Sequence, residues 1–148
     1  MKVYDITNEE VDTCESYFGT FIFNNDNLII PYINLGIAEN ELNPDKNLMF
    51  INYCYVVAKQ VNVFRLNENS NKIESQYFGG EGIGDMKDIY DIEVQAQQIQ
   101  LYLLENYKLA DIFHMWIPIS ENSNMNIDEV DDFINNRNLP DSLKRLVQ

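Results

Sequence analysis

Cations, histidine and cysteine are scarce in this sequence. Its 148 residues hold 10 Lys and Arg, one His and two Cys against 24 Asp and Glu, and the net charge is −14. A field of that sign repels nucleic acid and anionic membrane surfaces, because the phosphate contacts that dominate such binding need cations. The same field attracts basic proteins and speeds their encounter. We therefore expect a basic protein partner, no nucleic acid and no membrane, with solubility alone as the other reason for the acidity.

The scarcity of cysteine and of long apolar runs bears on the compartment. Cys14 and Cys54 do not point to a disulfide framework, and the start MKVYDITNEEV lacks the apolar stretch of a signal peptide. The longest strongly apolar stretch, Ile112–Ile119, is far shorter than a membrane span. These features predict a cytoplasmic protein with reduced thiols, in which Cys54 is a small buried hydrophobe.

The single histidine limits the chemistry that the chain can perform, because nucleophilic triads and most transition-metal sites need a His beside other specific groups. His114 lies among apolar residues in IFHMWIP, which predicts a packed core histidine, and its spacing from Cys14 and Cys54 matches no metal motif. A calcium loop starting at Asn122 also fails, since Ile127 and Phe133 occupy the positions that need Gly and Glu. We therefore predict no catalytic residue, no metal and no cofactor.

Four of the six glycines fall in FGGEGIGD, residues 78–85. A glycine-rich loop can hold phosphate through its backbone N–H groups, but this one lacks the Lys-Ser/Thr of a P-loop and the spacing of a dinucleotide fingerprint. Glu81 and Asp85 would also stand where a phosphate must sit. The segment is therefore predicted to be a simple connecting loop or a loop that faces a partner.

Apolar residues make up 45% of the chain, and eight Phe and nine Tyr supply large core side chains. These features predict one domain, 1–148, that folds without metal or disulfide. Residues Ser16–Phe23 and Leu28–Ile37 predict a hairpin around a four-residue turn, Asn24–Asn27. Pro31 would remove a ladder hydrogen bond, which predicts an edge strand or a bulge.

Further strands are predicted at Leu48–Leu66, with a bend or tight connection at Ala58–Gln60, and at Lys72–Phe78. Ile92–Leu104 fits a helix less well than a strand with one extra residue at Gln97-Gln98, which places six apolar side chains on one face. Ile112–Ile119, apolar on both faces, predicts a final central strand.

The end of the chain changes character. Asn126 followed by Glu129 resembles a capping box and predicts a helix from Ile127 to about Asn136. Pro140 can open a last short helix, Asp141–Val147. The expected fold is mainly β (α+β): a twisted antiparallel sheet or small sandwich over residues 1–120, with one or two helices in the C-terminal segment 126–147 packed on it.

Three acidic clusters are candidate binding sites. The first (Asp5, Glu9, Glu10, Asp12, Glu15) and the third (Glu121, Asp128, Glu129, Asp131, Asp132) contain no base. The third is explained in part by the dipole of the predicted helix, whose first turn favours acids. The second adjoins the glycine loop and has no such local explanation. A cationic partner would relieve its mutual repulsion, so we predict that the partner binds at Glu81, Asp85, Asp88, Asp91 and Glu93.

The runs FIFNNDNLIIPYINLGI and NYCYVVAKQVNVFRL, in a short acidic chain with a glycine-rich loop, resemble the immunity proteins of bacterial polymorphic and contact-dependent toxin systems. The resemblance covers residues 16–104 in strand pattern, size and charge. It implies an antitoxin without catalytic activity that binds a basic toxin domain, often a nuclease, and blocks it, as in contact-dependent growth inhibition. Two alternatives stay open: a small-molecule-binding β domain with a pocket lined by residues such as Tyr53, Tyr55 and Trp116, and an enzyme without a recognisable motif.

Overall fold

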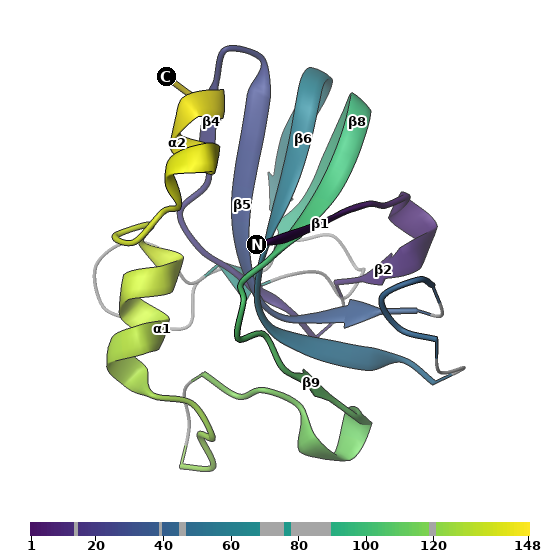
Figure 1. Cartoon of the computed structure of the whole chain (residues 1–148), viewed down its shortest axis with the longest axis vertical. Coiled ribbons are helices and arrows are strands. Elements are labelled where there is room, and N and C mark those ends of the chain that lie inside the picture. Colours follow the sequence, from purple (N-terminus) through teal and green to yellow (C-terminus); the bar gives the residue numbers. More distant parts are fainter. Residues whose placement is uncertain (14, 39, 45–46, 69–75, 78–89, 119–120) are drawn as a thin grey trace.

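The computed structural model describes residues 1–13, 15–38, 40–44, 47–68, 76–77, 90–118 and 121–148, with the backbone alone given for residues 8, 66–68, 76–77 and 90–92. The chain is mainly β, as predicted, and its curled sheet carries two short helices (Figure 1). The strands are β1 (Lys2–Asp5), β2 (Val11–Asp12), β3 (Tyr17–Phe18), β4 (Ile22–Asn24), β5 (Asn27–Ile37), β6 (Met49–Glu68), β7 (Gln76–Tyr77), β8 (Tyr90–Leu103) and β9 (Leu109–Ala110). The helices are α1 (Ile127–Ile134) and α2 (Asp141–Leu146), with single 3₁₀ turns η1 (Asn8–Glu10) and η2 (Ile112–His114).

The strands form one sheet rather than the two layers of a sandwich. Its order is β1-β8-β6-β5-β3-β7, with β2 and β4 also paired to β5 and β9 to β6. Every described pair is antiparallel except β3 with β7. The long strands β5, β6 and β8 stand side by side at the centre of the sheet (Figure 1).

The predicted hairpin is present, with a tighter turn and a divided first strand. Ile22–Asn24 pairs with Asn27–Ile29, so the turn consists of Asn25 and Asp26 alone. Both have positive φ, 53° and 61°, as the type I′ turn of a two-residue hairpin requires. The predicted strand Ser16–Phe23 is broken between β3 and β4, and both parts pair with β5.

Of the two alternatives predicted from Pro31, the edge strand is wrong, because β5 is paired on both sides. Its carbonyl accepts a hydrogen bond from the Gly19 amide at 2.9 Å, in the gap between β3 and β4. The N–H and C=O groups of one strand residue point to the same side of the strand. The N–H that proline lacks would therefore also point into this gap, where no strand residue needs it as a donor.

The segment Leu48–Leu66 forms one strand rather than two, with an irregularity near the predicted bend. Gln60 has a positive φ of 53°, and the register with β8 shifts between Val61 and Val63. Residues Ile92–Leu104 are a strand, as preferred over a helix, although the extra residue lies in β6 rather than at Gln97-Gln98. Five of the six apolar side chains of β8 expected on one face pack on one cluster: Val94, Ala96, Ile99, Leu101 and Leu103. Of Ile92 only the backbone is described.

Two asparagines form a corner in the sheet. Asn34 lies in β5 between Ile33, which pairs with Tyr53, and Leu35, which pairs with Ile51, and Asn52 lies between the same partners in β6. Asn34 has a φ of 58° and is 2% exposed. The apolar face changes phase here: Leu28, Ile30 and Tyr32 precede Leu35 and Ile37 in the same core cluster. A period of two would put Tyr32 and Leu35 on opposite faces, so each strand turns at its asparagine.

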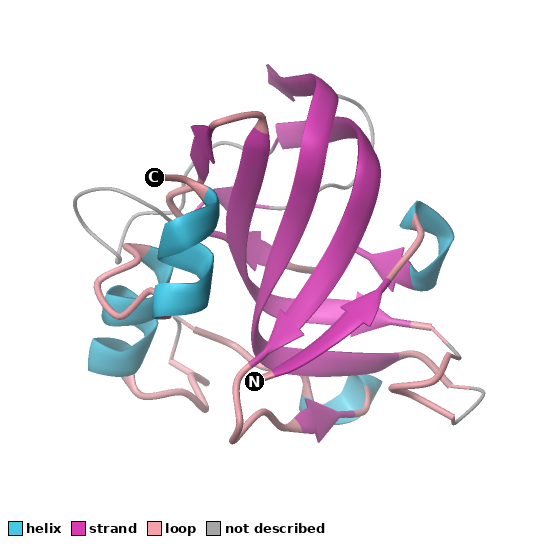
Figure 2. Ribbon diagram, turned by 45° about the horizontal axis from the view of Figure 1, so that its top comes forward, coloured by secondary structure: helices cyan, strands magenta, loops and turns pink. Residues whose placement is uncertain are grey.

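The core has two parts, one on each face of the sheet. The first cluster contains Leu28, Ile30, Cys54 and Leu101. Cys54 is fully buried, as predicted, and burial raises the pKa of its thiol. Cys14 lies outside the described residues. The second cluster joins the other face to the helices, which lie on one side of the sheet (Figure 2).

Both helices lie close to their predicted positions. The Asn126 side chain accepts hydrogen bonds from the amides of Asp128 and Glu129, which confirms the predicted N-cap of α1.

The carbonyls at the end of α2 and just after it face the β4–β5 hairpin. The amide of Asn24 donates to Val147 at 2.6 Å, Asn27 donates to Leu146 at 2.8 Å, and Asn25 donates to Gln148. The hairpin asparagines thus satisfy carbonyls that a helix end leaves open.

The predicted central strand Ile112–Ile119 is wrong. Residues Ile112–His114 form η2, and Met115–Pro118 form no strand. Side chains take the backbone hydrogen bonds that a strand would need: Asn34 accepts from the Trp116 amide, and Asn124 accepts from Ile117 and donates to the Met115 carbonyl. These side chains supply the hydrogen bonds that a neighbouring strand would otherwise supply to the backbone, so the segment can be apolar without being a strand.

Candidate interaction surface

The predicted acidic site is only partly described. Glu81, Asp85 and Asp88 lie outside the described residues, and of Asp91 only the backbone in β8 is given. Glu93 lies 3.9 Å from the guanidinium of Arg65, across the β6–β8 ladder. The partner site at these five residues therefore stays a prediction.

Several acids of the other two clusters have local structural roles. Glu10 accepts hydrogen bonds from the amide and hydroxyl of Thr7, at 2.9 and 3.2 Å, and closes a capping box on η1. Asp5 accepts from Gln98 and Gln100 across the β1–β8 pair. In α1, Asp131 and Asp132 both pair with Arg137. Local hydrogen bonds and ion pairs therefore explain part of this acidity without a partner.

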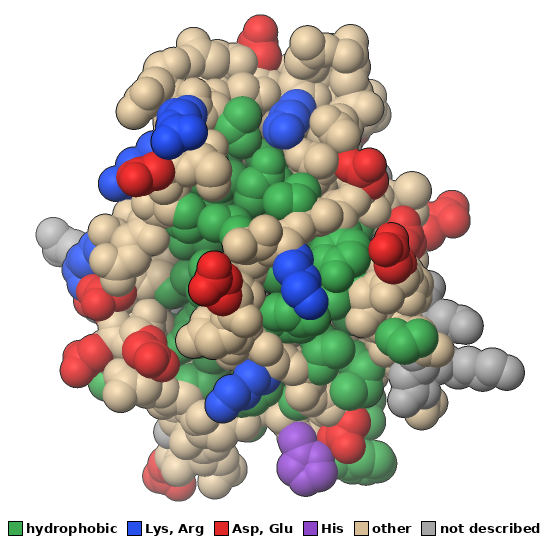
Figure 3. Space-filling view, viewed as in Figure 1, with side chains coloured by type: hydrophobic (Ala, Val, Ile, Leu, Met, Phe, Trp, Pro, Cys, Tyr) green, Lys and Arg blue, Asp and Glu red, His purple; other side chains and the backbone are tan. Residues whose placement is uncertain are grey.

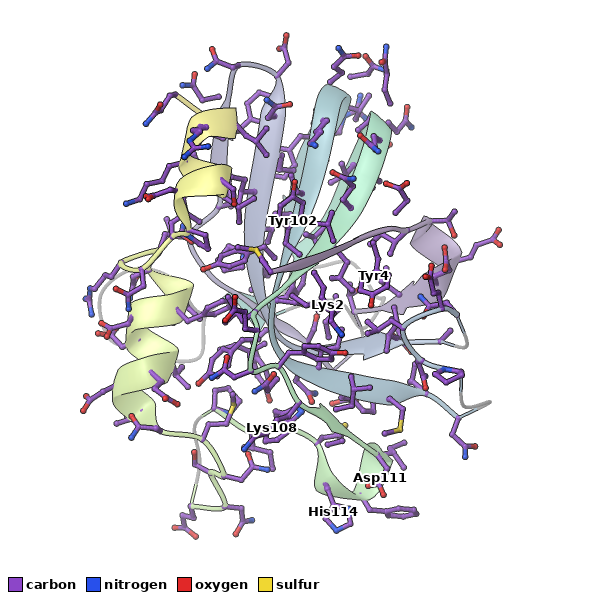
Figure 4. All side chains as sticks on the ribbon, in the orientation of Figure 1. Lys2, Tyr4, Tyr102, Lys108, Asp111 and His114 are labelled. Atoms are coloured by element: carbon purple, nitrogen blue, oxygen red, sulfur yellow. The ribbon has the colours of Figure 1, made fainter. Side chains whose placement is uncertain are left out.

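Acidic side chains nevertheless occupy both sides of one face of the molecule, along α1 and around η1 and β2, with apolar and some basic side chains between them (Figure 3). Asp128 and Glu129 stand in the first turn of α1, where the helix dipole favours them. Lys108 stands between α1 and η2 on this face (Figure 4).

The turn η2 carries Phe113, the most exposed large apolar side chain of the described residues. Phe113 is 88% exposed and Ile112 is 56% exposed. The Asp111 carboxylate accepts a hydrogen bond from the Phe113 amide at 3.0 Å and lies 2.7 Å from Nδ1 of His114 (Figure 4). The hydrogen bond with His114 lowers the pKa of Asp111. His114 is itself 78% exposed, so the prediction of a core histidine is wrong.

The asparagine corner holds the segment 108–116, which carries η2, at both ends. The Asn52 side-chain oxygen accepts a hydrogen bond from the backbone N–H of Lys108 at 2.9 Å, and the backbone N–H of Asn52 donates to the Lys108 carbonyl at 3.1 Å. Asn34 accepts from the Trp116 amide at 2.9 Å, and the Trp116 indole donates to the Phe50 carbonyl at 3.0 Å. Phe113 is therefore exposed on a segment fixed to the centre of the sheet.

A pocket of about 370 Å³ opens between the end of β8, the corner of β6 and α1. Its lining combines three aromatic rings, two carboxylates, one ammonium group, three amides and one leucine: Tyr53, Tyr55, Phe133, Glu129, Asp132, Lys108, Asn52, Asn106, Asn138 and Leu104. The rings of Tyr53 and Tyr55 lie 4.8 and 4.9 Å from that of Phe133. Trp116, expected in such a pocket, is not among the lining residues.

The Tyr53 hydroxyl in this pocket is buried and has no hydrogen-bond partner among the described residues. Burial raises the pKa of Tyr53 to about 12, with a smaller contribution from the charge of Glu129. The phenol therefore stays neutral at physiological pH. A buried polar atom without a partner is unusual in a folded protein.

Sequence reasoning missed the exposed turn η2 and anticipated the pocket only through Tyr53 and Tyr55. Asp111, two residues before Phe113, is a typical N-cap residue, and Pro118 weakens the case for a central strand. The pocket brings together β6, the segment after β8 and α1, and no local pattern connects these three.

Within the described part of the chain, no group of His, Cys, Asp and Glu could hold a metal ion, and no helix is long and apolar enough to cross a membrane. No protein-family model matches the chain, and neither a curated protein nor a solved structure shows significant similarity to it.

Proposed function

We propose that this protein is an immunity protein: a protein-binding inhibitor without catalytic activity that neutralises a cognate basic toxin domain, such as a nuclease, by occlusion. The observation that carries the proposal is the exposed aromatic turn η2, fixed at both ends and set in a molecule of net charge −14. Aromatic side chains that fill a partner's pocket dominate the affinity of protein interfaces. A fixed turn loses less conformational entropy on binding than a free loop does.

The charge complements the aromatic turn. A nuclease must hold phosphates in its active site and therefore presents cations there. An acidic protein surface can bind those cations in place of the nucleic acid. Charge steers the encounter, whereas buried apolar contact slows dissociation. Acidic surface and exposed phenylalanine therefore have separate roles in one inhibitor.

The second candidate function is a small-molecule-binding β domain, which the pocket favours because Tyr53 and Tyr55 line it as that alternative requires. The two functions differ in their simplest experiment. An inhibitor silences the toxin of the neighbouring gene when the two are co-expressed, and its inhibition titrates to an endpoint near one inhibitor per toxin. Cells that die despite soluble inhibitor, or silencing of excess toxin by a trace amount, would contradict occlusion.

Replacing Phe113 with serine is expected to weaken inhibition about 30-fold, or about 2 kcal/mol, because the exposed ring is the anchor of the interface. Thermal unfolding should hardly change, since this side chain is 88% exposed. Val3→Ser is the matched control, because Val3 is also an exposed apolar residue, at 43%, but lies on β1. Equal inhibition by the Phe113 variant and the parent protein would remove η2 from the interface.

Reversing charge at Asp85 and Asp88 tests the acidic site predicted from the sequence. Two Asp→Lys changes raise the net charge from −14 to −10, and we expect roughly tenfold slower association with little change in dissociation. The parent's association rate should also fall as salt rises. Glu9→Lys with Glu41→Lys makes the same change in net charge on the described, exposed surface. If both double variants slow association equally, the overall field acts and the local site does not.

A further inference from the structure

We infer that the pocket beside α1 receives an arginine side chain of the bound partner. This inference rests on the proposed function and names the group that its basic partner inserts. The pocket lies next to the segment that carries η2, because Lys108, which lines it, begins that segment. A partner that covers Phe113 and extends along this segment to Lys108 therefore reaches the pocket as well.

The chemistry of the lining fits a guanidinium group. Tyr53 is only partly buried and offers its ring, while the buried rings of Tyr55 and Phe133, 2% and 8% exposed, contribute to the apolar lining. Guanidinium groups stack on aromatic rings more readily than ammonium groups do. Glu129 and Asp132 offer carboxylate acceptors. A guanidinium carries five donors in one plane and no acceptor, so carboxylates suit it as partners.

The lining contains charges of both signs, and the negative ones predominate. Glu129 and Asp132 outnumber Lys108, and Asp132 shares its charge with Arg137 at 3.2 Å. Glu129 is thus the carboxylate of the lining that can best pair with an incoming cation, and it acts on Tyr53 electrostatically. Lys108 opposes a cation, so its removal should strengthen binding.

The probe is N-acetyl-arginine amide, titrated into the isotope-labelled protein and followed by NMR. We expect saturable shifts at Tyr53, Leu104 and Phe133 with a dissociation constant on the order of 1 mM, because a single side chain makes few contacts. N-acetyl-citrulline amide has nearly the same shape without the charge, and should bind at least tenfold more weakly. Equal binding of the two amides, or shifts spread over the whole surface, would overturn the inference.

Variants of α1 separate the pocket from the general field. Glu129→Gln should weaken binding of the arginine amide about tenfold, and Lys108→Gln should strengthen it. Asp128→Asn removes the same charge from the same helical turn at a residue that does not line the pocket, and should leave binding within twofold. Equal losses in the Glu129 and Asp128 variants would contradict the assignment.

This experiment fails independently of the proposed function. The titration needs no toxin. If the arginine amide does not bind the pocket, the inference is overturned, whereas the proposed function is tested separately by the assay of toxin inhibition. Conversely, charge-selective binding of the amide supports the pocket assignment even if co-expression shows no protection.

Discussion

Replacing Asn34 with alanine should lower the free energy of unfolding by about 3 kcal/mol. The Asn34 amide donates to the Glu15 carbonyl at 2.9 Å, and its oxygen accepts from the Trp116 amide at the same distance. Alanine removes both bonds in a residue that is 2% exposed, and it must adopt a φ of 58°, which L-residues with a Cβ resist. Urea unfolding measures the loss, and the single tryptophan, Trp116, reports locally by fluorescence.

Asn34→Gly separates the two causes. Glycine adopts positive φ without strain but makes neither hydrogen bond, so it should be roughly 1 kcal/mol more stable than the alanine variant. If glycine and alanine destabilise equally, backbone strain contributes nothing at the corner. Both variants should also loosen η2 and weaken inhibition, because Asn34 holds Trp116 at one end of the segment that carries Phe113.

Replacing Gly19 with alanine should destabilise the protein by about 3 kcal/mol or more, through overpacking against α1. A Cβ at this position would meet the Ile134 carbonyl oxygen at 2.2 Å and the Ile134 Cα at 2.6 Å. These are backbone atoms, so relief requires α1 to move away from the sheet. That movement would break the hydrogen bond from the Thr20 amide to the Ile134 carbonyl, now 2.7 Å long. Calorimetric unfolding gives the magnitude.

Gly36→Ala is the matched control, since Gly36 lies in the same sheet but away from the helices. The nearest contacts of its added Cβ would be the Asp12 carbonyl oxygen at 2.9 Å and the Asp12 Cβ at 3.1 Å. Asp12 belongs to the two-residue strand β2, which can shift more easily than a packed helix. We expect about 1 kcal/mol, and an equal loss in both variants would show that the contact with α1 is not special.

Local chemistry made much of this fold predictable. Asn25 and Asp26 tolerate positive φ, so their position marks the hairpin turn, and Asn126 marks the start of α1 through its side chain. In β8 the alternation of apolar and polar residues distinguished a strand from a helix although Ala and Gln favour helices. In each case the residues that fix the backbone are neighbours in sequence.

The errors have the opposite origin. Ile112–Ile119 has the composition of a strand, but its backbone is held by Asn34 and Asn124, residues that its own pattern does not reveal. Asn34 and Asn52 stand between the same two residue pairs of the β5–β6 ladder, where the apolar faces change phase, and each alone is only a polar residue in an apolar run. The pocket was anticipated through Tyr53 and Tyr55, whereas the participation of Phe133 and Glu129 depends on where α1 docks.

The three hairpin asparagines that hold α2 have a consequence for hydrogen exchange. A helix of six residues is too short to persist alone, so α2 depends on its docking to the sheet. Asn27 and Leu146 are 119 positions apart in the chain, yet one hydrogen bond joins them. Amides of the β4–β5 hairpin and of α2 should therefore exchange with solvent deuterium as one cooperative unit, with the same opening free energy.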